Sequence, residues 1–193
     1  MHLFSAVILA GGASRRMGRD KAWLTWQGDS LLARQTRLAK MAGAEEVFIS
    51  GRPGVDYSAL DCPVLFDSVP ECGPLGGVER GLAATRHPLL LVLAVDLPFL
   101  EADLLTALLA ECTSEVGAIP KHERGLEPLI GFYPQTCQEI ARDFLQQQIL
   151  AAHTFALECS KRNLIKLLPF ESSRRDFTNL NRPEDAPNEL PPV

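Results

Sequence analysis

The chain has 193 residues, of which 46% are hydrophobic, and it carries a formal net charge of -5 at pH 7. This length is enough for one well-filled core and short for two, so we expect a single domain over residues 1–193. The acidic balance argues against a surface that coats nucleic acid, because such a surface needs clustered excess lysine and arginine. No apolar run approaches the roughly 20 residues of a membrane span. We therefore expect no nucleic-acid partner and no membrane partner.

The cysteines are odd in number, widely spaced and without a C-x-x-C pair: Cys62, Cys72, Cys112, Cys137 and Cys159. This usage is typical of reduced, mostly buried thiols. The sequence also lacks a charged leader with an apolar core and a cleavage site. Together these features predict a cytoplasmic protein without disulfides.

A short apolar strand leads directly into a cationic, glycine-rich loop. Residues 4–9 are almost continuously apolar, as in a strand buried on both faces. The loop, residues 9–21, combines three glycines, three arginines and a lysine: Gly11, Gly12, Gly18, Arg15, Arg16, Arg19 and Lys21. Glycines permit positive φ and let backbone N–H groups approach a ligand, and parallel sheets open their ligand crevice beyond the carboxyl ends of their strands. The loop favours binding of an anion with several phosphates; a structural strand-to-helix turn is the alternative.

The spacing of this loop fits neither of two common phosphate-binding motifs. Gly18 is followed by Arg19, Asp20 and Lys21 instead of the Lys and Ser or Thr of a P-loop. Gly11 and Gly12 are adjacent, which excludes the dinucleotide fingerprint G-x-G-x-x-G. The residues alone therefore indicate a generic phosphate-binding turn.

The rest of the chain alternates strands and helices. Periodicity and caps predict helices at 31–42, from the turn 72–77 to about 87, at 101–112, at 135–150 and at 155–159. Apolar runs predict strands at 47–50, 63–66, 89–95, 116–120, 127–133 and 164–168. The run 89–95 is the most apolar and should lie in the centre of the sheet, whereas Pro128 suggests that 127–133 lies at an edge or begins pairing late. The predicted class is α/β, a three-layer α/β/α fold with a mostly parallel mixed sheet.

Two aspartates follow strands and are candidates for the site. Asp96 comes directly after the run 89–95, and Asp67 follows the third strand. A polyphosphate site usually brings Mg²⁺, which prefers one or two carboxylates together with phosphate oxygens and waters. Asp96 is the best-placed metal ligand, with a helix N-cap or turn residue as the alternative. Asp67 could bind the ribose, the base or metal-bound water, or be a solvated turn residue.

Short motifs from the first strand to the tail occur in the order found in one known family. They are Leu9-Ala10-Gly11-Gly12, Ser14, Arg16-Met17-Gly18, Asp20-Lys21, Gly73-Pro74-Leu75, Asp96-Leu97-Pro98-Phe99 and residues 179–185. These residues resemble the molybdenum cofactor guanylyltransferase family. The resemblance implies a Rossmann-like nucleotidyltransferase fold and transfer of GMP from GTP to the terminal phosphate of molybdopterin or Mo-molybdopterin, with release of pyrophosphate. It also implies Mg²⁺ as cofactor and extends the expected partners to molybdoenzyme maturation proteins.

The same resemblance assigns roles to residues of this sequence. Nucleotide-binding roles fall to Leu9, Ala10, Gly11, Gly12, Lys21, Ser50, Asp67 and Asp96, with Asp96 holding Mg²⁺. Ser50 stands where the family has a base-contacting asparagine, and Asn179 and Asn181 fit its paired asparagines on the molybdopterin side. Residues 1–100 would form mainly the nucleotide half, 101–185 mainly the molybdopterin half, and 186–193 a loose tail. Lys21, Asp96 and Arg16 are the expected catalytic residues, with Arg15, Arg16 or Arg19 reaching toward the second substrate's phosphate.

Gly12 carries the expected choice of nucleotide. Guanylyl members of the family resemble Leu-Ala-Gly-Gly at this position, whereas related cytidylyl enzymes tend to have Leu-Ala-Ala-Gly. Two alternatives remain: a related nucleotidyltransferase that uses CTP or a sugar phosphate, and a non-catalytic nucleotide-binding module. The joint presence of Lys21 and Asp96 favours an enzyme.

Overall fold

The computed structural model describes residues 3–11, 21–67, 72–171 and 175–180. The strands are β1 (Phe4–Leu9), β2 (Thr25–Trp26), β3 (Asp29–Ser30), β4 (Glu46–Ser50), β5 (Val64–Leu65), β6 (Leu89–Ala94), β7 (Gly117–His122), β8 (Gly125–Leu126), β9 (Ile130–Pro134) and β10 (Ile165–Pro169). The α-helices are α1 (Leu31–Met41), α2 (Gly73–Ala84), α3 (Ala102–Ala110), α4 (Cys137–Gln146) and α5 (Ala152–Lys161). Three 3₁₀ turns are η1 (Lys21–Trp23), η2 (Ser58–Leu60) and η3 (Arg175–Phe177).

The central sheet is mixed and mostly parallel, as predicted. Its strand order is β10-β7-β9-β6-β1-β4-β5, and β8 pairs with β7 outside this path. The strands β1, β4, β5 and β6 are parallel neighbours, while β9 runs antiparallel to both β6 and β7. The most apolar strand, β6, lies inside the sheet between β9 and β1, which confirms its predicted central place.

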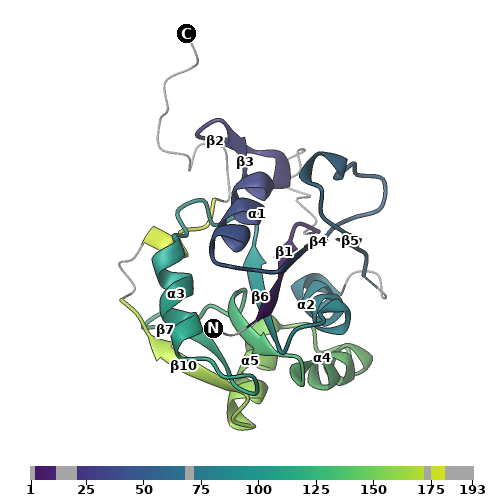
Figure 1. The fold of residues 1–193 in the computed structure, drawn as a ribbon. Helices are drawn as coiled ribbons and strands as arrows, with labels where there is room; N and C mark the ends of the chain where they lie inside the picture. The colour runs from purple at the N-terminus through teal and green to yellow at the C-terminus, as the bar shows by residue number, and fades with distance from the viewer. Residues whose placement is uncertain (1–2, 12–20, 68–71, 172–174, 181–193) are drawn as a thin grey trace.

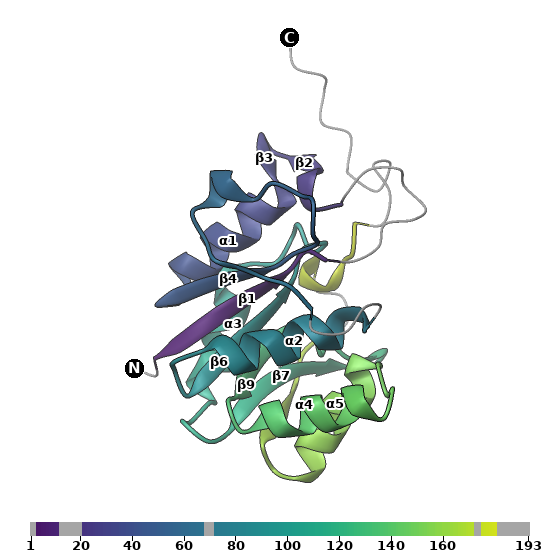
Figure 2. The ribbon, with the colours of Figure 1, turned by 90° about the vertical axis from the view of Figure 1, so that its right-hand side faces the viewer.

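Helices cover both faces of the sheet, as Figures 1 and 2 show. Alternate residues of each strand point to opposite faces, so Leu91 of β6 packs with α1 and α3, whereas Leu90 and Val92 pack with α2, α4 and α5. The same alternation places Ala6 of β1 in the first cluster and Val7 in the second. The three-layer α/β/α arrangement predicted from the sequence is therefore confirmed.

Local sequence signals explain the best-predicted elements. The first strand has the predicted bounds, and α1 begins where the Ser30 hydroxyl accepts a hydrogen bond from the Ala33 N–H at 3.1 Å. It ends before Gly43, which has a φ of 98°. All five cysteines are free thiols, and four of them are buried. None of the helices in the described part of the chain is long and apolar enough to cross a membrane.

Five predicted elements differ from the structure in length or place. The short helix predicted at 155–159 is the ten-residue helix α5, Ala152–Lys161. The strand 63–66 is reduced to β5. The helix α2 ends at Ala84, since the Thr85 backbone is extended, and the Thr85 hydroxyl bonds to Ser5 at 2.8 Å. The helix α4 stops at Gln146, since Gln148 adopts a φ of 59°. The edge position for 127–133 is wrong, since β9 lies inside the sheet; its late start at Ile130, after Pro128, is confirmed.

Candidate functional site

The candidate nucleotide residues lie along one edge of the sheet. The register pairs Leu9 with Ser50 on β4 and with Ala94 on β6, and Ser50 pairs in turn with Leu65 on β5. Because these four strands are parallel, the segments that follow them leave at the same edge. Asp96 and Asp67 each follow the last residue of their strand by two positions. The strands β4 and β6 lie on opposite sides of β1, so the chain order reverses at this edge. Open α/β sheets bind ligands at such a point.

Lys21 and Asp96 form an ion pair at this edge. The Lys21 Nζ lies 3.2 Å from Oδ2 of Asp96, and their side chains are 22% and 25% exposed. Lys21 opens the turn η1, whose Ala22 is buried, while Asp96 follows the fully buried strand β6. The structure thus brings together a cation and a carboxylate that are far apart in the sequence and leaves both partly accessible.

The backbone after β1 continues its pairing with β4. The Ala10 N–H donates to the Ser50 carbonyl oxygen at 2.9 Å. Gly11 does not have a positive φ, so the freedom that glycine offers at φ is not used here. A Cβ on Gly11 would lie 3.6 Å from the carbonyl oxygens of Ser50 and Gly51, at ordinary contact distance. What Gly11 contributes is the absence of a side chain on this part of the edge.

The first turns of α2 pack closely against the ends of β1 and β4. Ser50 is buried, and a Cβ on Gly77 would collide with its hydroxyl and lie 2.7 Å from Cδ2 of Leu9. The Ser50 side chain therefore faces α2. Its role in binding the base stays a prediction, and the same contact explains why α2 opens with small residues at Gly76 and Gly77.

Asp67 lies beside the first turn of α2. A Cβ on Gly76 would collide with Sγ of Cys72 and lie 3.1 Å from Oδ1 of Asp67. Burial raises the pKa of the Asp67 carboxyl, while a hydrogen bond from the Cys72 thiol and the nearby Arg80 charge lower it. Burial and the contact with Asp67 raise the pKa of Cys72 to about 11, so this thiol stays protonated and donates to the carboxylate.

The C-terminal segment returns to the same edge and brings Asn179 there. The Leu180 N–H donates to the Asp96 carbonyl oxygen at 2.8 Å, and the Leu180 side chain is buried. Asn179 itself is exposed, next to this contact. Its neighbour Phe177 packs against His122 at the end of β7, with ring centroids 4.9 Å apart. The segment thus connects the end of β6 with the end of β7.

The donor set suits a metal ion that is held largely by its substrate. Asp96 offers one accessible carboxylate, and the described residues contain no group of three His, Cys, Asp or Glu side chains able to hold a metal. Mg²⁺ commonly binds through one or two carboxylates plus substrate phosphates and waters. The residues at the end of β6 therefore fit Mg²⁺ bound together with a nucleotide.

Sequence reasoning missed several residues at this edge. Gln35 lies on the buried face of α1, and its amide Nε2 donates to the Leu97 carbonyl oxygen at 2.6 Å. Arg52 follows β4, and its Cγ lies 3.9 Å from a Cβ built on Gly11. Asp176 accepts a hydrogen bond from the Glu101 N–H at 3.1 Å. The signal for Gln35 in the sequence is a glutamine at a position of α1 whose spacing from Leu31, Leu32 and Leu38 predicts burial.

Some candidate residues and the surface pockets stand apart from this geometry. Gly12, Arg16 and Asn181 lie outside the described residues. Two pockets of about 350 and 400 Å³ adjoin Asp61, Cys62 and Pro63 near β5, and neither is lined by Lys21 or Asp96. In the described part of the chain, the edge that carries Lys21 and Asp96 is a better candidate than these pockets because it combines charge with convergent strand ends.

Known proteins resemble this chain over nearly its whole length. A probable molybdenum cofactor guanylyltransferase of Opitutus terrae is 37% identical over 190 residues, covering 96% of this chain and 94% of the relative. A molybdenum cofactor guanylyltransferase of Xanthomonas euvesicatoria is 34% identical over 187 residues, covering 94% and 91%.

Solved structures share the fold at lower sequence identity. The molybdopterin-guanine dinucleotide biosynthesis protein A of Archaeoglobus fulgidus has a TM-score of 0.71 at 23% identity, over 94% of each chain. A 2-C-methyl-D-erythritol 4-phosphate cytidylyltransferase of Thermus thermophilus reaches 0.70 at 22% identity, over 96% of each chain. The model of the MobA-like NTP transferase domain matches residues 6–159. Consistent with the parallel strand ends and the Lys21–Asp96 pair, the chain belongs to the MobA-like NTP transferase family.

Proposed function

We propose that this protein transfers GMP from GTP to the terminal phosphate of molybdopterin, forming molybdopterin guanine dinucleotide and pyrophosphate. The observation that carries the proposal is the alignment of Asp67, Ala10, Gly11 and Asp96 along one edge of four parallel strands, with Lys21 paired to Asp96. Relatives named molybdenum cofactor guanylyltransferase, which cover more than nine-tenths of the chain, support the choice of substrates.

The reaction needs no nucleophile from the protein, because the substrate supplies it; the enzyme must instead stabilise negative charge. A phosphate oxygen of molybdopterin attacks the α-phosphorus of GTP, and the bond from that phosphorus to the bridging oxygen of pyrophosphate breaks. Both reactants are anions, so the enzyme must bring them in line and stabilise the charge that develops at the α-phosphate. Lys21 supplies positive charge at the edge where the phosphates would lie. We expect Asn179 to contact the second substrate; its neighbour Leu180 bonds to the Asp96 backbone, which supports this role.

We propose Mg²⁺ as the cofactor, held by Asp96 together with oxygens of the nucleotide. When bound, Mg²⁺ would neutralise phosphate charge and stabilise the pyrophosphate leaving group. Lys21 pairs with Asp96 in this structure, and we expect Lys21 to turn toward the phosphates as the nucleotide binds.

Substrate selectivity tests the proposal directly. The purified protein is incubated with molybdopterin, Mg²⁺ and either GTP or CTP, and pyrophosphate release is followed. Release that requires both GTP and molybdopterin supports the proposal. Release with CTP, or with a sugar phosphate in place of molybdopterin, identifies a different nucleotidyltransferase, and binding without release identifies a nucleotide-binding module.

Loss of either charged partner should abolish most of the activity. We expect Lys21→Ala and Asp96→Ala each to lower turnover by roughly 10²-fold or more, as removal of other preorganised charge stabilisers does. Circular dichroism should show an unchanged fold, since both side chains are partly exposed. Lys40→Ala and Asp143→Ala are matched controls, because both residues are exposed on helices. Near-normal guanylyl transfer by either site variant would remove its proposed role.

A further inference from the structure

The loop after β6, residues 96–101, is held at three backbone atoms by distant parts of the chain. The Gln35 amide of α1 donates to the Leu97 carbonyl oxygen at 2.6 Å. The Leu180 N–H donates to the Asp96 carbonyl oxygen at 2.8 Å, and Asp176 accepts from the Glu101 N–H at 3.1 Å. Two of these contacts fall on consecutive carbonyl groups, at Asp96 and Leu97. The peptide that carries the Asp96 side chain is therefore fixed from both sides.

Gln35 is an unexpected residue for its position. It is fully buried on a helix face that otherwise carries Leu31, Leu32 and Leu38, and an apolar residue would pack there. Its Oε1 is buried without a hydrogen-bond partner among the described residues. An unpaired buried acceptor destabilises a fold, because it has lost its hydrogen bonds to water without replacement. The hydrogen bond from Gln35 to the Leu97 carbonyl oxygen is the contact that an apolar residue at this position could not make.

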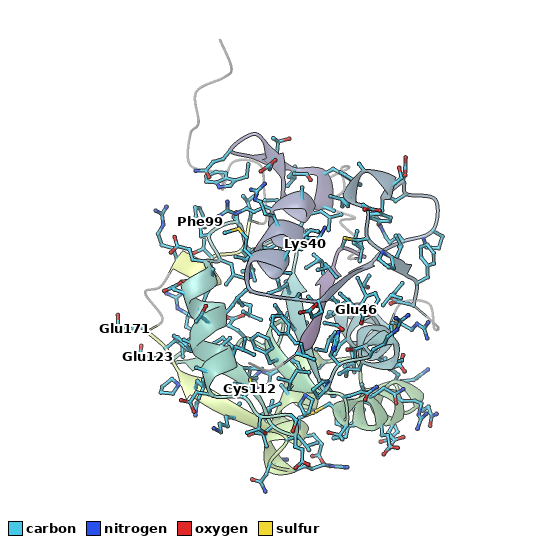
Figure 3. The ribbon with its side chains drawn as sticks, viewed as in Figure 1. Lys40, Glu46, Phe99, Cys112, Glu123 and Glu171 are labelled. Atoms are coloured by element: carbon cyan, nitrogen blue, oxygen red, sulfur yellow. The ribbon has the colours of Figure 1, made fainter. Side chains whose placement is uncertain are left out.

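Asp176 holds the other end of the loop. Its side chain is buried in η3, and the guanidinium carbon of the neighbouring Arg175 lies 4.7 Å from the centroid of the Phe99 ring. Figure 3 shows Phe99 beside η3. The ring of Phe99 also meets Trp26 edge to face, at 5.3 Å between centroids. The segment 175–180 thus packs along the whole loop and not on one residue of it.

We infer that Gln35 and Asp176 are positioning residues for Asp96. This inference rests on the proposed function of Asp96, and it goes further by assigning roles to two residues that act through the backbone of the loop. A catalytic group works only when it is held within about 0.5 Å of its productive position, and a misplacement of about 1 Å can lower the rate 10²-fold. Gln35 holds the loop from the α1 side, and Asp176 holds it from the C-terminal segment that also carries Asn179.

Substitutions at Asp176 separate positioning from general stability. Asp176→Asn keeps an oxygen that can accept from the Glu101 N–H, whereas Asp176→Ala removes the acceptor. We expect Asp176→Ala to lower kcat by about 10-fold or more while KM for GTP changes little, and Asp176→Asn to restore most of the rate. Equal losses in the two variants, or a rise in KM at unchanged kcat, would overturn the role of Asp176.

A pair of glutamine variants tests the α1 contact in the same way. Gln35→Met keeps the length of the side chain and loses the donor. Gln138→Met is the control: Gln138 is a half-buried glutamine of α4, away from the loop, and its amide donates to Glu79 of α2 at 3.0 Å. We expect a fall in kcat for Gln35→Met alone. A similar fall in both would show that loss of any glutamine side-chain contact is responsible and would overturn the role of Gln35.

Hydrogen exchange of the unliganded protein provides a second readout that requires no substrate. Amides of residues 96–101 should exchange faster in Asp176→Ala and Gln35→Met than in wild type, and at the wild-type rate in Asp176→Asn and Gln138→Met. Unchanged exchange in Asp176→Ala and Gln35→Met would overturn the inference. If the wild-type protein transfers no GMP, the proposed function fails, while the exchange data still support or refute the hold on the loop. Should Gln35→Met not fold, the Asp176 variants decide the outcome.

Discussion

At the scale of single residues, Asp67 has a raised pKa and accepts a hydrogen bond from the Cys72 thiol, which has room beside it because residue 76 is glycine. Burial is the largest cause of the raised pKa of Asp67, and the Cys72 thiol opposes it. The thiol fits there because Gly76 has no Cβ. The ionised form of the Asp67 carboxyl is therefore less favourable in the folded protein than in the unfolded chain. Such a destabilising charge is typical of a functional residue.

Asp67→Asn should increase stability in a pH-dependent manner. Because the pKa of Asp67 is higher in the folded state, its ionisation favours unfolding at pH values above that pKa. Well below the unfolded-state pKa the carboxyl is protonated in both states and contributes no pH dependence. We expect Asp67→Asn to raise Tm near pH 7, to raise it less near about pH 3.5, and to weaken GTP binding. Thermal unfolding at both pH values checks this, and an equal gain at both would contradict it.

Gly77 should resist the replacement that usually stabilises helices. Alanine is favoured over glycine in a helix by about 1 kcal/mol, but overpacking costs about 1–3 kcal/mol. In Gly77→Ala the new methyl group meets Ser50 and Leu9, so we expect a lower unfolding midpoint in urea. Ala83 lies on the exposed face of α2, so Ala83→Gly measures the difference in helix propensity between alanine and glycine without any change in packing. Adding Ser50→Gly to Gly77→Ala should recover part of the loss; an unchanged midpoint in Gly77→Ala would contradict the close packing.

At the scale of elements, the end of α2 is determined by a buried polar network. The Ser5 hydroxyl donates to the Glu46 carboxylate at 2.9 Å, and Thr85 Oγ1 donates to Ser5 and accepts from the His87 N–H at 3.1 Å. Glu46 is labelled in Figure 3. These contacts connect Thr85, the residue that follows α2, with β1 and β4, at the end of the sheet opposite Asp96. The periodic pattern alone predicts a helix that continues to about residue 87.

Removing the Thr85 hydroxyl should destabilise the fold and leave catalysis intact. Thr85→Val keeps the shape and leaves buried partners unpaired, so we expect a loss of roughly 1–3 kcal/mol. The control Thr106→Val alters an exposed threonine on α3 that bonds to the Ala102 carbonyl, and should change stability by about 0.5 kcal/mol or less. Urea unfolding measures both effects, and equal changes in the two variants would refute the network's contribution.

At the scale of the whole molecule, β9 joins the two expected halves of the site. It pairs antiparallel with β6, which ends at Ala94 just before Asp96, and with β7, which ends at His122. The approach of β7 and β9 is very close, since a Cβ on Gly117 would collide with the Phe132 carbonyl. Gly131, with a φ of 151°, lies against the Ala118 carbonyl oxygen. Both contacts are with backbone, which cannot move as a side chain can.

Gly117→Ala should therefore weaken the whole fold. Overpacking against backbone is expected to cost about 1–3 kcal/mol or more, and no rotamer change can relieve it. We expect a single urea transition at a lower midpoint, detected alike by circular dichroism and by tryptophan fluorescence, since Trp23 and Trp26 report on the distant half. A midpoint equal to that of the wild type would show that β7 and β9 can separate without loss.

The sequence by itself determined the alternation of elements, the bounds of β1, the central place of β6 and the family motifs. These features depend on apolar period, capping and turn chemistry, which are properties of neighbouring residues. Only the tertiary structure decided that β9 inserts between β6 and β7, and that Gln35 and Asp176 reach the loop after β6 from positions 62 and 75 residues away. Local patterns specify which face of an element is buried, but the partner that covers it depends on the packing of the whole chain.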